Sequence, residues 1–211
     1  MQALTREPSC SKADELLDKC RWGSSFDAQL APIVIDKCEK GFLQKLTSEE
    51  KARYREELYL CAYEYAKQEG TISISENYVC QADVAARFAA NPALAKQPAP
   101  RASFDCNRAA TQLENAICAD KKLGQADIVL GRAYKAVLSS MTSEDRPTII
   151  RLQKEWLRNV TAKCTVASKP LSPAQRECVR NEFEARFMDL DGCGIGGPEE
   201  CLNHLRSPRS N

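Results

Sequence analysis

The sequence predicts an all-α fold made of two related, disulfide-stapled helical domains in tandem. Helix-start signals recur along the chain, each followed by apolar residues at helical spacing. Eleven cysteines are spread over the 211 residues, and no C-x-x-C pair is present among them. A proline-containing stretch then separates two halves that carry similar landmarks in the same order.

The helix starts are predicted from residue pairs with the spacing of a capping box, in which side chain and backbone satisfy each other. These pairs are Thr47 with Glu50, Thr111 with Glu114, Thr142 with Asp145, and Ser172 with Gln175. Two apolar stripes at helical spacing follow the last two pairs: Ile149, Leu152, Trp156 and Val160, then Val179, Phe183, Phe187 and Leu190. Only "TISIS" at 71–75 resembles a strand.

The domain boundaries are predicted from the stretch over 91–102, which has three prolines and the character of a linker. On either side, four cysteines, a Thr-Ser-Glu string and an Ala-Arg-Phe string recur in one order. We therefore expect an N-terminal helical domain over 1–90, a second over 103–192, and a C-terminal tail over 193–211. Chance agreement of the short strings is the alternative explanation.

The cysteines indicate an oxidising compartment, because dispersed cysteines without metal-site spacing are typical of disulfides. We expect a periplasmic or secreted protein whose signal peptide has been removed, since "MQALTREPSC" lacks the features of one. Cys38 is the predicted leftover, because the second half has no equivalent; a bridge from Cys38 to the C-terminal pair is the alternative. The predicted disulfide cysteines are Cys10, Cys20, Cys61, Cys80, Cys106, Cys118, Cys164, Cys178, Cys193 and Cys201.

Cys106 and Cys118 are twelve positions apart, so their pairing depends on local geometry. One continuous helix would separate their Cα atoms by about 18 Å. A disulfide needs roughly 4.4–6.8 Å. The chain must therefore reverse between them, and Thr111 supplies the helix start after the reversal. Ser11 and Asp14, which follow Cys10, have the same arrangement.

The C-terminal tail contains a possible metal-ligand set of Cys193, Cys201 and His204. A structural zinc site usually has four ligands at tighter spacing, so we expect a Cys193–Cys201 disulfide, no metal and no cofactor. His204 is the one histidine of the chain, which disfavours a hydrolase with a Ser-His or Cys-His pair. A metal-dependent or cysteine-based enzyme centred on this tail is the remaining enzymatic alternative.

Composition limits the class of partner. The formal net charge is only +1, which argues against nucleic-acid binding. The sequence has no run of about 18 apolar residues, so no membrane span is expected. A protein partner is therefore favoured.

The second half contains a series of residues that together resemble a known family. They are "SFDC" at 103–106, Glu114, "IC" at 117–118, Leu123, Asp127, Tyr134, Gln153, Trp156, Leu157, Cys164, Cys178 and "EARF" at 184–187. This pattern resembles the LprI-type lysozyme-inhibitor family over about residues 101–192. The resemblance implies a helical, disulfide-bonded exported domain and, for some members, binding and inhibition of lysozyme. Ala126 departs from the pattern, which usually has a leucine-type residue there.

A candidate binding loop lies between Cys164 and Cys178, which are expected to pair. A loop of about 15 residues closed in this way gains about 3 kcal/mol of stability. The predicted partner-binding residues are Ser168, Lys169, Pro170 and Leu171. The ammonium group of Lys169 would suit a lysozyme cleft, which holds two carboxylates. An ordinary solvated loop is the alternative, and Gln153 and Trp156 are interpreted as structural.

Taken together, the sequence predicts a non-enzymatic exported bacterial protein that binds and inhibits a cell-wall-degrading enzyme. The partner would be a lysozyme or a peptidoglycan-degrading toxin, so the protein would be a lysozyme inhibitor or an immunity-type protein. A non-enzymatic envelope adaptor is the alternative.

Overall fold

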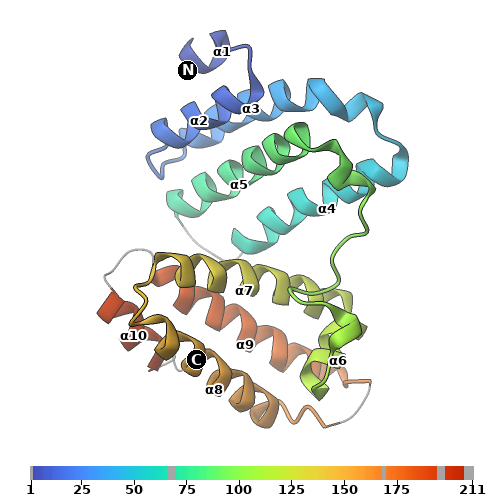
Figure 1. Ribbon diagram of the computed structural model, residues 1–211, viewed down its shortest axis with the longest axis vertical. Coiled ribbons are helices and arrows are strands. Elements are labelled where there is room, and N and C mark those ends of the chain that lie inside the picture. Colours follow the sequence, from blue (N-terminus) through green and yellow to red (C-terminus); the bar gives the residue numbers. More distant parts are fainter. Residues whose placement is uncertain (1, 66–69, 168–169, 194–197, 207–211) are drawn as a thin grey trace. The chain divides into compact units, whose positions relative to one another are not determined.

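The computed structural model describes residues 2–65, 70–167, 170–193 and 198–206, and every regular element in these ranges is a helix (Figure 1). The predicted all-α fold is confirmed. The chain divides into two compact units, Met1–Ala99 and Pro100–Asn211. Within the described ranges, none of the helices combines the length and hydrophobicity that crossing a bilayer requires.

The first unit is organised around its last long helix, α5, which packs against α2, α3 and α4. Its elements are α1 (Gln2–Arg6), α2 (Cys10–Cys20), α3 (Asp27–Phe42), η1 (Leu43–Lys45), α4 (Ser48–Tyr65), α5 (Thr71–Ala90) and η2 (Pro92–Lys96). Three buried rings meet in its core: the Tyr54 ring centroid lies 5.3 Å from that of Phe42 and 5.1 Å from that of Phe88.

The second unit is organised around α7, which packs against α6 and α9, while α10 packs against α8 and α9. Its elements are η3 (Cys106–Arg108), α6 (Gln112–Ala119), α7 (Lys121–Ser140), α8 (Arg146–Lys163), α9 (Pro173–Gly192) and α10 (Pro198–Arg206). Trp156 and Phe183 are buried with ring centroids 5.5 Å apart, so both apolar stripes predicted in this half face the core.

Three of the four predicted helix starts form by the predicted local hydrogen bonds. At the fourth, Thr142 and Asp145 bond to each other, but α8 begins only at Arg146 and has no side-chain cap. Thr111 with Glu114 and Ser172 with Gln175 make complete capping boxes at the first turns of α6 and α9. Thr47 and Glu50 exchange the same two bonds, from Glu50 N–H to Thr47 Oγ1 and from Thr47 N–H to Glu50 Oε2. Because these bonds join residues three apart, the sequence alone is sufficient to predict them.

The strand predicted at 71–75 is wrong, because these residues form the first turns of α5. In the helix Ser73 and Ser75 are buried, whereas Ile72 and Ile74 are exposed. The buried Ser75 hydroxyl donates to Asp27 Oδ2 at 2.7 Å, which satisfies its polar group. A run of five residues is too short for its alternation to distinguish a strand from one face of a helix.

Both segments that the sequence leaves outside the two domains contain ordered helix. Pro92–Lys96 forms η2, whose Ala95 is buried in the first unit, and that unit extends to Ala99. Pro198–Arg206 forms α10, which buries Cys201 and Leu205. Each segment is shorter than ten residues and has only a few apolar side chains, which gives too weak a pattern for sequence-based detection.

Five disulfides staple the units. They are Cys10–Cys38, Cys61–Cys80, Cys106–Cys118, Cys164–Cys178 and Cys193–Cys201. Between Cys106 and Cys118 the chain makes the η3 turn and reverses before α6, which brings the two Cα atoms to 5.7 Å. Since Cys193 and Cys201 pair with each other, neither is available to Cys38 or as a zinc thiolate.

The prediction that Cys20 is bonded and Cys38 is free is wrong. Cys10 and Cys20 begin and end one uninterrupted helix, α2, so their Cα atoms lie about 15 Å apart. Cys38 lies on the neighbouring α3, with its Cα 4.8 Å from that of Cys10. Cys20 is left as an exposed free thiol. Unlike the Cys106 segment, the chain after Cys10 does not reverse.

We expect the native protein to take up one alkyl group from iodoacetamide, on Cys20, because the other ten cysteines are bonded. Peptide mass mapping after non-reducing digestion measures the labelled position. Cys20→Ser should abolish labelling without lowering the melting temperature. A label on Cys38 or Cys10 would contradict the observed pairing.

Candidate functional site

The second unit begins with a non-helical segment, 101–104, that lies directly on α7. Gly124 and Gly131 lie on the face of α7 that the segment covers, with Asp127 between them. A Cβ atom at Gly124 would overlap the carbonyl oxygen of Arg101, and one at Gly131 would overlap the side chain of Ser103. The two glycines therefore permit a close approach that any larger residue would block.

Asp127 fixes this segment by a hydrogen bond. Its Oδ2 atom accepts the backbone N–H of Ser103 at 2.7 Å. Burial raises the pKa of the Asp127 carboxyl above its usual value, although the bonds from Ser103 oppose that effect. The carboxylate is thus held where water cannot fully solvate it.

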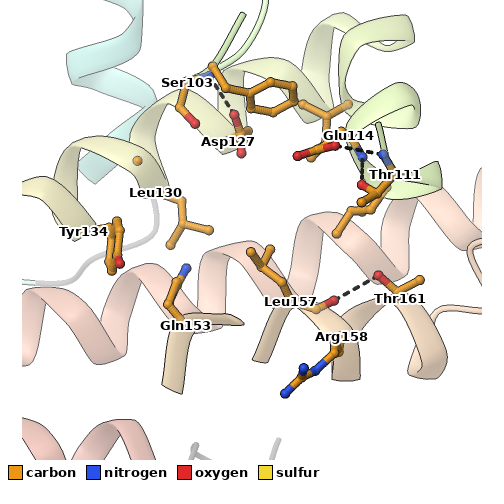
Figure 2. A pocket seen from close by; sticks show the side chains of 14 residues that line it. Ser103, Thr111, Glu114, Asp127, Leu130, Tyr134, Gln153, Leu157, Arg158 and Thr161 are labelled. Atoms are coloured by element: carbon orange, nitrogen blue, oxygen red, sulfur yellow. Dashed lines mark hydrogen bonds between the residues drawn. The ribbon is translucent and has the colours of Figure 1, made fainter. Parts of the chain in front are cut away.

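Next to this contact is a cavity of about 290 Å³ between α6, α7 and α8 (Figure 2). Its apolar walls are Phe104, Leu113, Ile117, Leu130 and Leu157. Its principal polar groups are Glu114, Asp127, Tyr134, Gln153 and Arg158. Because Thr111 and Arg158 also line it and are exposed, the cavity opens to solvent. Mostly apolar walls with a few convergent polar groups are typical of small-ligand sites.

Gln153 is held in one orientation by Arg186. The Gln153 side chain is only 8% exposed, and its Oε1 atom accepts from Arg186 Nε at 3.0 Å. The guanidinium can only donate, so the amide oxygen must face it and the amide nitrogen must point away. Arg186 is itself fixed, since its Nη1 donates to the carbonyl of Leu205 at 3.3 Å and its guanidinium lies over the Trp156 ring.

Glu114 contributes a charged oxygen on the opposite side of the cavity. Its Oε2 atom accepts the backbone N–H groups of Thr111 and Ala110, each at 2.8 Å. The bond from the Thr111 N–H lowers the pKa of Glu114 most, and the bond from the Ala110 N–H adds to this effect. Together they hold that pKa below its usual value of 4.5. The carboxylate is therefore ionised at neutral pH, and its other oxygen is turned toward the cavity in Figure 2.

The predicted binding loop is anchored at both of its described ends. Val166 and Leu171 are buried, and Gln175 Nε2 donates to the carbonyl of Thr165 at 2.6 Å. Ser168 and Lys169 lie outside the described residues, and Pro170 is exposed. The prediction that Leu171 contacts a partner is wrong, because its side chain is only 6% exposed and belongs to the core.

The cavity was not predicted from the sequence, although many of the residues that form it belong to the family pattern. Ser103, Phe104, Glu114, Ile117, Asp127, Tyr134, Gln153 and Leu157 carry the family resemblance and line the cavity together. Gln153, which the sequence suggests is only structural, therefore also faces a ligand-sized space. The available signal was helical spacing: positions 127, 131 and 134 share one face of α7, and 153, 157 and 161 share one face of α8.

The C-terminal tail offers little for metal chemistry. Its two cysteines form the Cys193–Cys201 disulfide, and His204 Nε2 lies 3.8 Å from Glu200 Oε1. Among the residues that the structure describes, no group of three His, Cys, Asp or Glu side chains is placed to hold a metal ion.

Gly124→Ala is expected to lower the free energy of unfolding by about 1–3 kcal/mol, because the new methyl group must displace the backbone at Arg101. Urea denaturation followed by circular dichroism measures this change. Gly192→Ala is the matched control, since a Cβ atom there meets nothing within 4 Å. Equal effects of the two substitutions would show that the close approach to Arg101 is not limiting.

Glu114→Gln is expected to cost roughly 0.5–1 kcal/mol at pH 7, because a neutral amide is a weaker cap for two N–H groups than a carboxylate. The folded-state pKa is below 4.5, so this contribution is complete above pH 4.5 and is lost as the pH falls through the lowered value. Chemical denaturation of both proteins over a pH series measures the difference. Glu144→Gln, at an exposed position, is the control. A cost that does not vary with pH would contradict the assignment.

Comparison with known proteins gives two matches and one negative result. The family model described as "Lysozyme inhibitor LprI" matches residues 106–190. An uncharacterized protein of Rhizobium meliloti (strain 1021) is 30% identical over 127 residues, which cover 56% of this chain and 80% of the relative. No solved structure gives a significant match.

The matched residues 106–190 run from Cys106, at the start of η3, to Leu190 near the end of α9. They include α6, α7 and α8, whose side chains line the cavity, together with the Cys106–Cys118 and Cys164–Cys178 disulfides. The chain belongs to the LprI lysozyme-inhibitor family.

Proposed function

We propose that this protein is exported and inhibits a cell-wall-degrading enzyme, either a lysozyme or a peptidoglycan-degrading toxin. The observation that carries the proposal is the family match over residues 106–190, since LprI proteins are inhibitors rather than enzymes. Five disulfides fit an oxidising compartment, which supports a periplasmic or secreted location.

The segment proposed for the contact is the loop between Cys164 and Cys178. The disulfide joins the end of α8 to the first turns of α9, and Val166 and Leu171 anchor the chain on either side of 168–170. A loop restrained in this way loses little conformational entropy when it binds, which favours tight inhibition.

Lys169 is the proposed contact residue within this loop. Glycoside hydrolases that cleave the cell-wall glycan use two carboxyl groups in their active-site cleft. An ammonium group inserted between them would pair with the ionised carboxylate and exclude the substrate. Ser168 and Pro170 would flank this contact.

We expect the purified protein to inhibit at least one member of a panel of lysozymes and peptidoglycan-degrading toxins at near-stoichiometric concentration. Loss of turbidity of a cell-wall suspension measures the activity. Lys169→Ala should weaken inhibition at least tenfold, because it removes the charge that pairs with the cleft. Lys154→Ala, at an exposed lysine on α8, is the matched control and should inhibit as the wild type does.

Inhibition that survives Lys169→Ala would keep the inhibitor function but place the contact elsewhere on the molecule. Failure to inhibit any enzyme of the panel would count against the proposal and favour the envelope adaptor. Capture of partners from an envelope extract, followed by an activity test of each, would then decide between an adaptor and an inhibitor of a toxin outside the panel.

A further inference from the structure

The cavity of the second unit has a hydrogen-bond donor on one side and acceptors on another, separated by apolar walls. The donor is Gln153 Nε2 on α8; Figure 2 shows this nitrogen turned toward Leu130 and the cavity. The acceptors are Glu114 on α6 and Asp127 on α7. A bound group must therefore satisfy a donor and an acceptor in different directions.

The Gln153 donor is preorganised and has no assigned acceptor. Arg186 occupies the Oε1 atom at 3.0 Å, which leaves the amide nitrogen on the cavity side. Among the described residues, no hydrogen bond joins this nitrogen to an acceptor of the protein, although the side chain is more than nine-tenths buried. Because the cavity opens to solvent, water can reach this nitrogen in the free protein, and an acceptor brought by a ligand would take the place of that water.

The acceptors exclude several kinds of ligand. The Glu114 carboxylate uses Oε2 for its two backbone bonds, and Asp127 binds Ser103 N–H through Oδ2. Both carboxyl groups repel an anion, and the guanidinium of Arg158, which also lines the cavity, is turned away from it in Figure 2. A simple cation would pair with them but would leave Gln153 Nε2 without an acceptor. A polyol would place hydroxyl groups against Phe104, Leu130 and Leu157 without partners.

We propose that the cavity binds a neutral secondary amide with a small apolar acyl group. The carbonyl oxygen of the amide accepts from Gln153 Nε2, its N–H donates to Glu114 or Asp127, and its acyl group lies against the apolar walls. A volume of about 290 Å³ is at the small end for ligand sites, and it has room for an N-acyl group. Such a group occurs in N-acetylated amino sugars and in peptides.

This site is distinct from the loop proposed to contact a lytic enzyme. Its lining residues lie on α6, α7, α8 and at 103–104, whereas the loop joins α8 to α9. The inference does not rest on the proposed function. The protein could bind an amide without inhibiting a lytic enzyme, or inhibit the enzyme without binding an amide, and the two experiments distinguish these outcomes.

The test is a nuclear magnetic resonance titration of the full-length ¹⁵N-labelled protein. The probes are methyl N-acetyl-β-glucosaminide and N-acetylglycine N-methylamide, with methyl glucoside and butylammonium as controls that lack the amide. We expect a saturable shift of the Gln153 side-chain NH₂ resonances with at least one amide probe. Binding of the sugar alone would identify an amino sugar as the source, and binding of the dipeptide analogue alone would identify a peptide.

Two variants test the contacts. Gln153→Glu retains an acceptor for Arg186 but removes the donor, so amide binding should weaken at least tenfold. Leu157→Phe fills part of the cavity and should weaken binding without altering the Arg186 contact. Gln125→Glu, on α7 and outside the cavity lining, is the matched control and should bind as the wild type does.

The proposal is overturned if neither amide shifts these resonances, or if methyl glucoside or butylammonium shifts them as strongly. Unchanged binding by a folded Gln153→Glu protein would also overturn it. If that variant does not fold, Leu157→Phe decides in the same way, because unchanged affinity would mean that the amide binds outside the cavity.

Discussion

The close contact between the 101–104 segment and α7 is the constraint on which the second unit depends. Gly124 and Gly131 allow the segment to approach, and the Asp127–Ser103 hydrogen bond holds it there. The entry of the chain is thereby fixed two residues before the 3-10 turn that carries Cys106, which brings Cys118 within disulfide distance. The position of α6, and with it one wall of the cavity, follows from this contact.

The first unit places a buried aspartate at a comparable point, with different energetics. Asp27 accepts from the Ser75 hydroxyl and from the N–H groups of Trp22 and Ser24. Burial acts to raise its pKa, but these bonds outweigh that effect and the pKa is lowered, whereas the pKa of Asp127 is raised. Asp27 therefore serves as a satisfied structural anion, while Asp127 has fewer donors and faces a cavity. The origin of the two halves by duplication stays a prediction.

The accuracy of the sequence-based predictions depended on the range of the interactions concerned. The Thr111–Glu114 capping box was predictable because it joins residues three apart in the sequence. The Cys10–Cys38 disulfide was not, because it depends on how α2 packs against α3 and on α2 being continuous to Cys20. The cavity was missed because it exists only where three helices meet, although the spacing of 153, 157 and 161 placed one of its walls on a single helix face.

The cavity and the loop are mechanically linked through the helices that form them. Thr161 lines the cavity, and its carbonyl accepts the backbone N–H of Val166 at 3.0 Å, at the start of the loop. Gln112, at the start of α6, donates to the carbonyl of Ala167 at 3.4 Å. The first residues of the loop are therefore held by two helices that also wall the cavity. Because the Cys164–Cys178 disulfide fixes the same region covalently, the packing that shapes the cavity also restrains the loop.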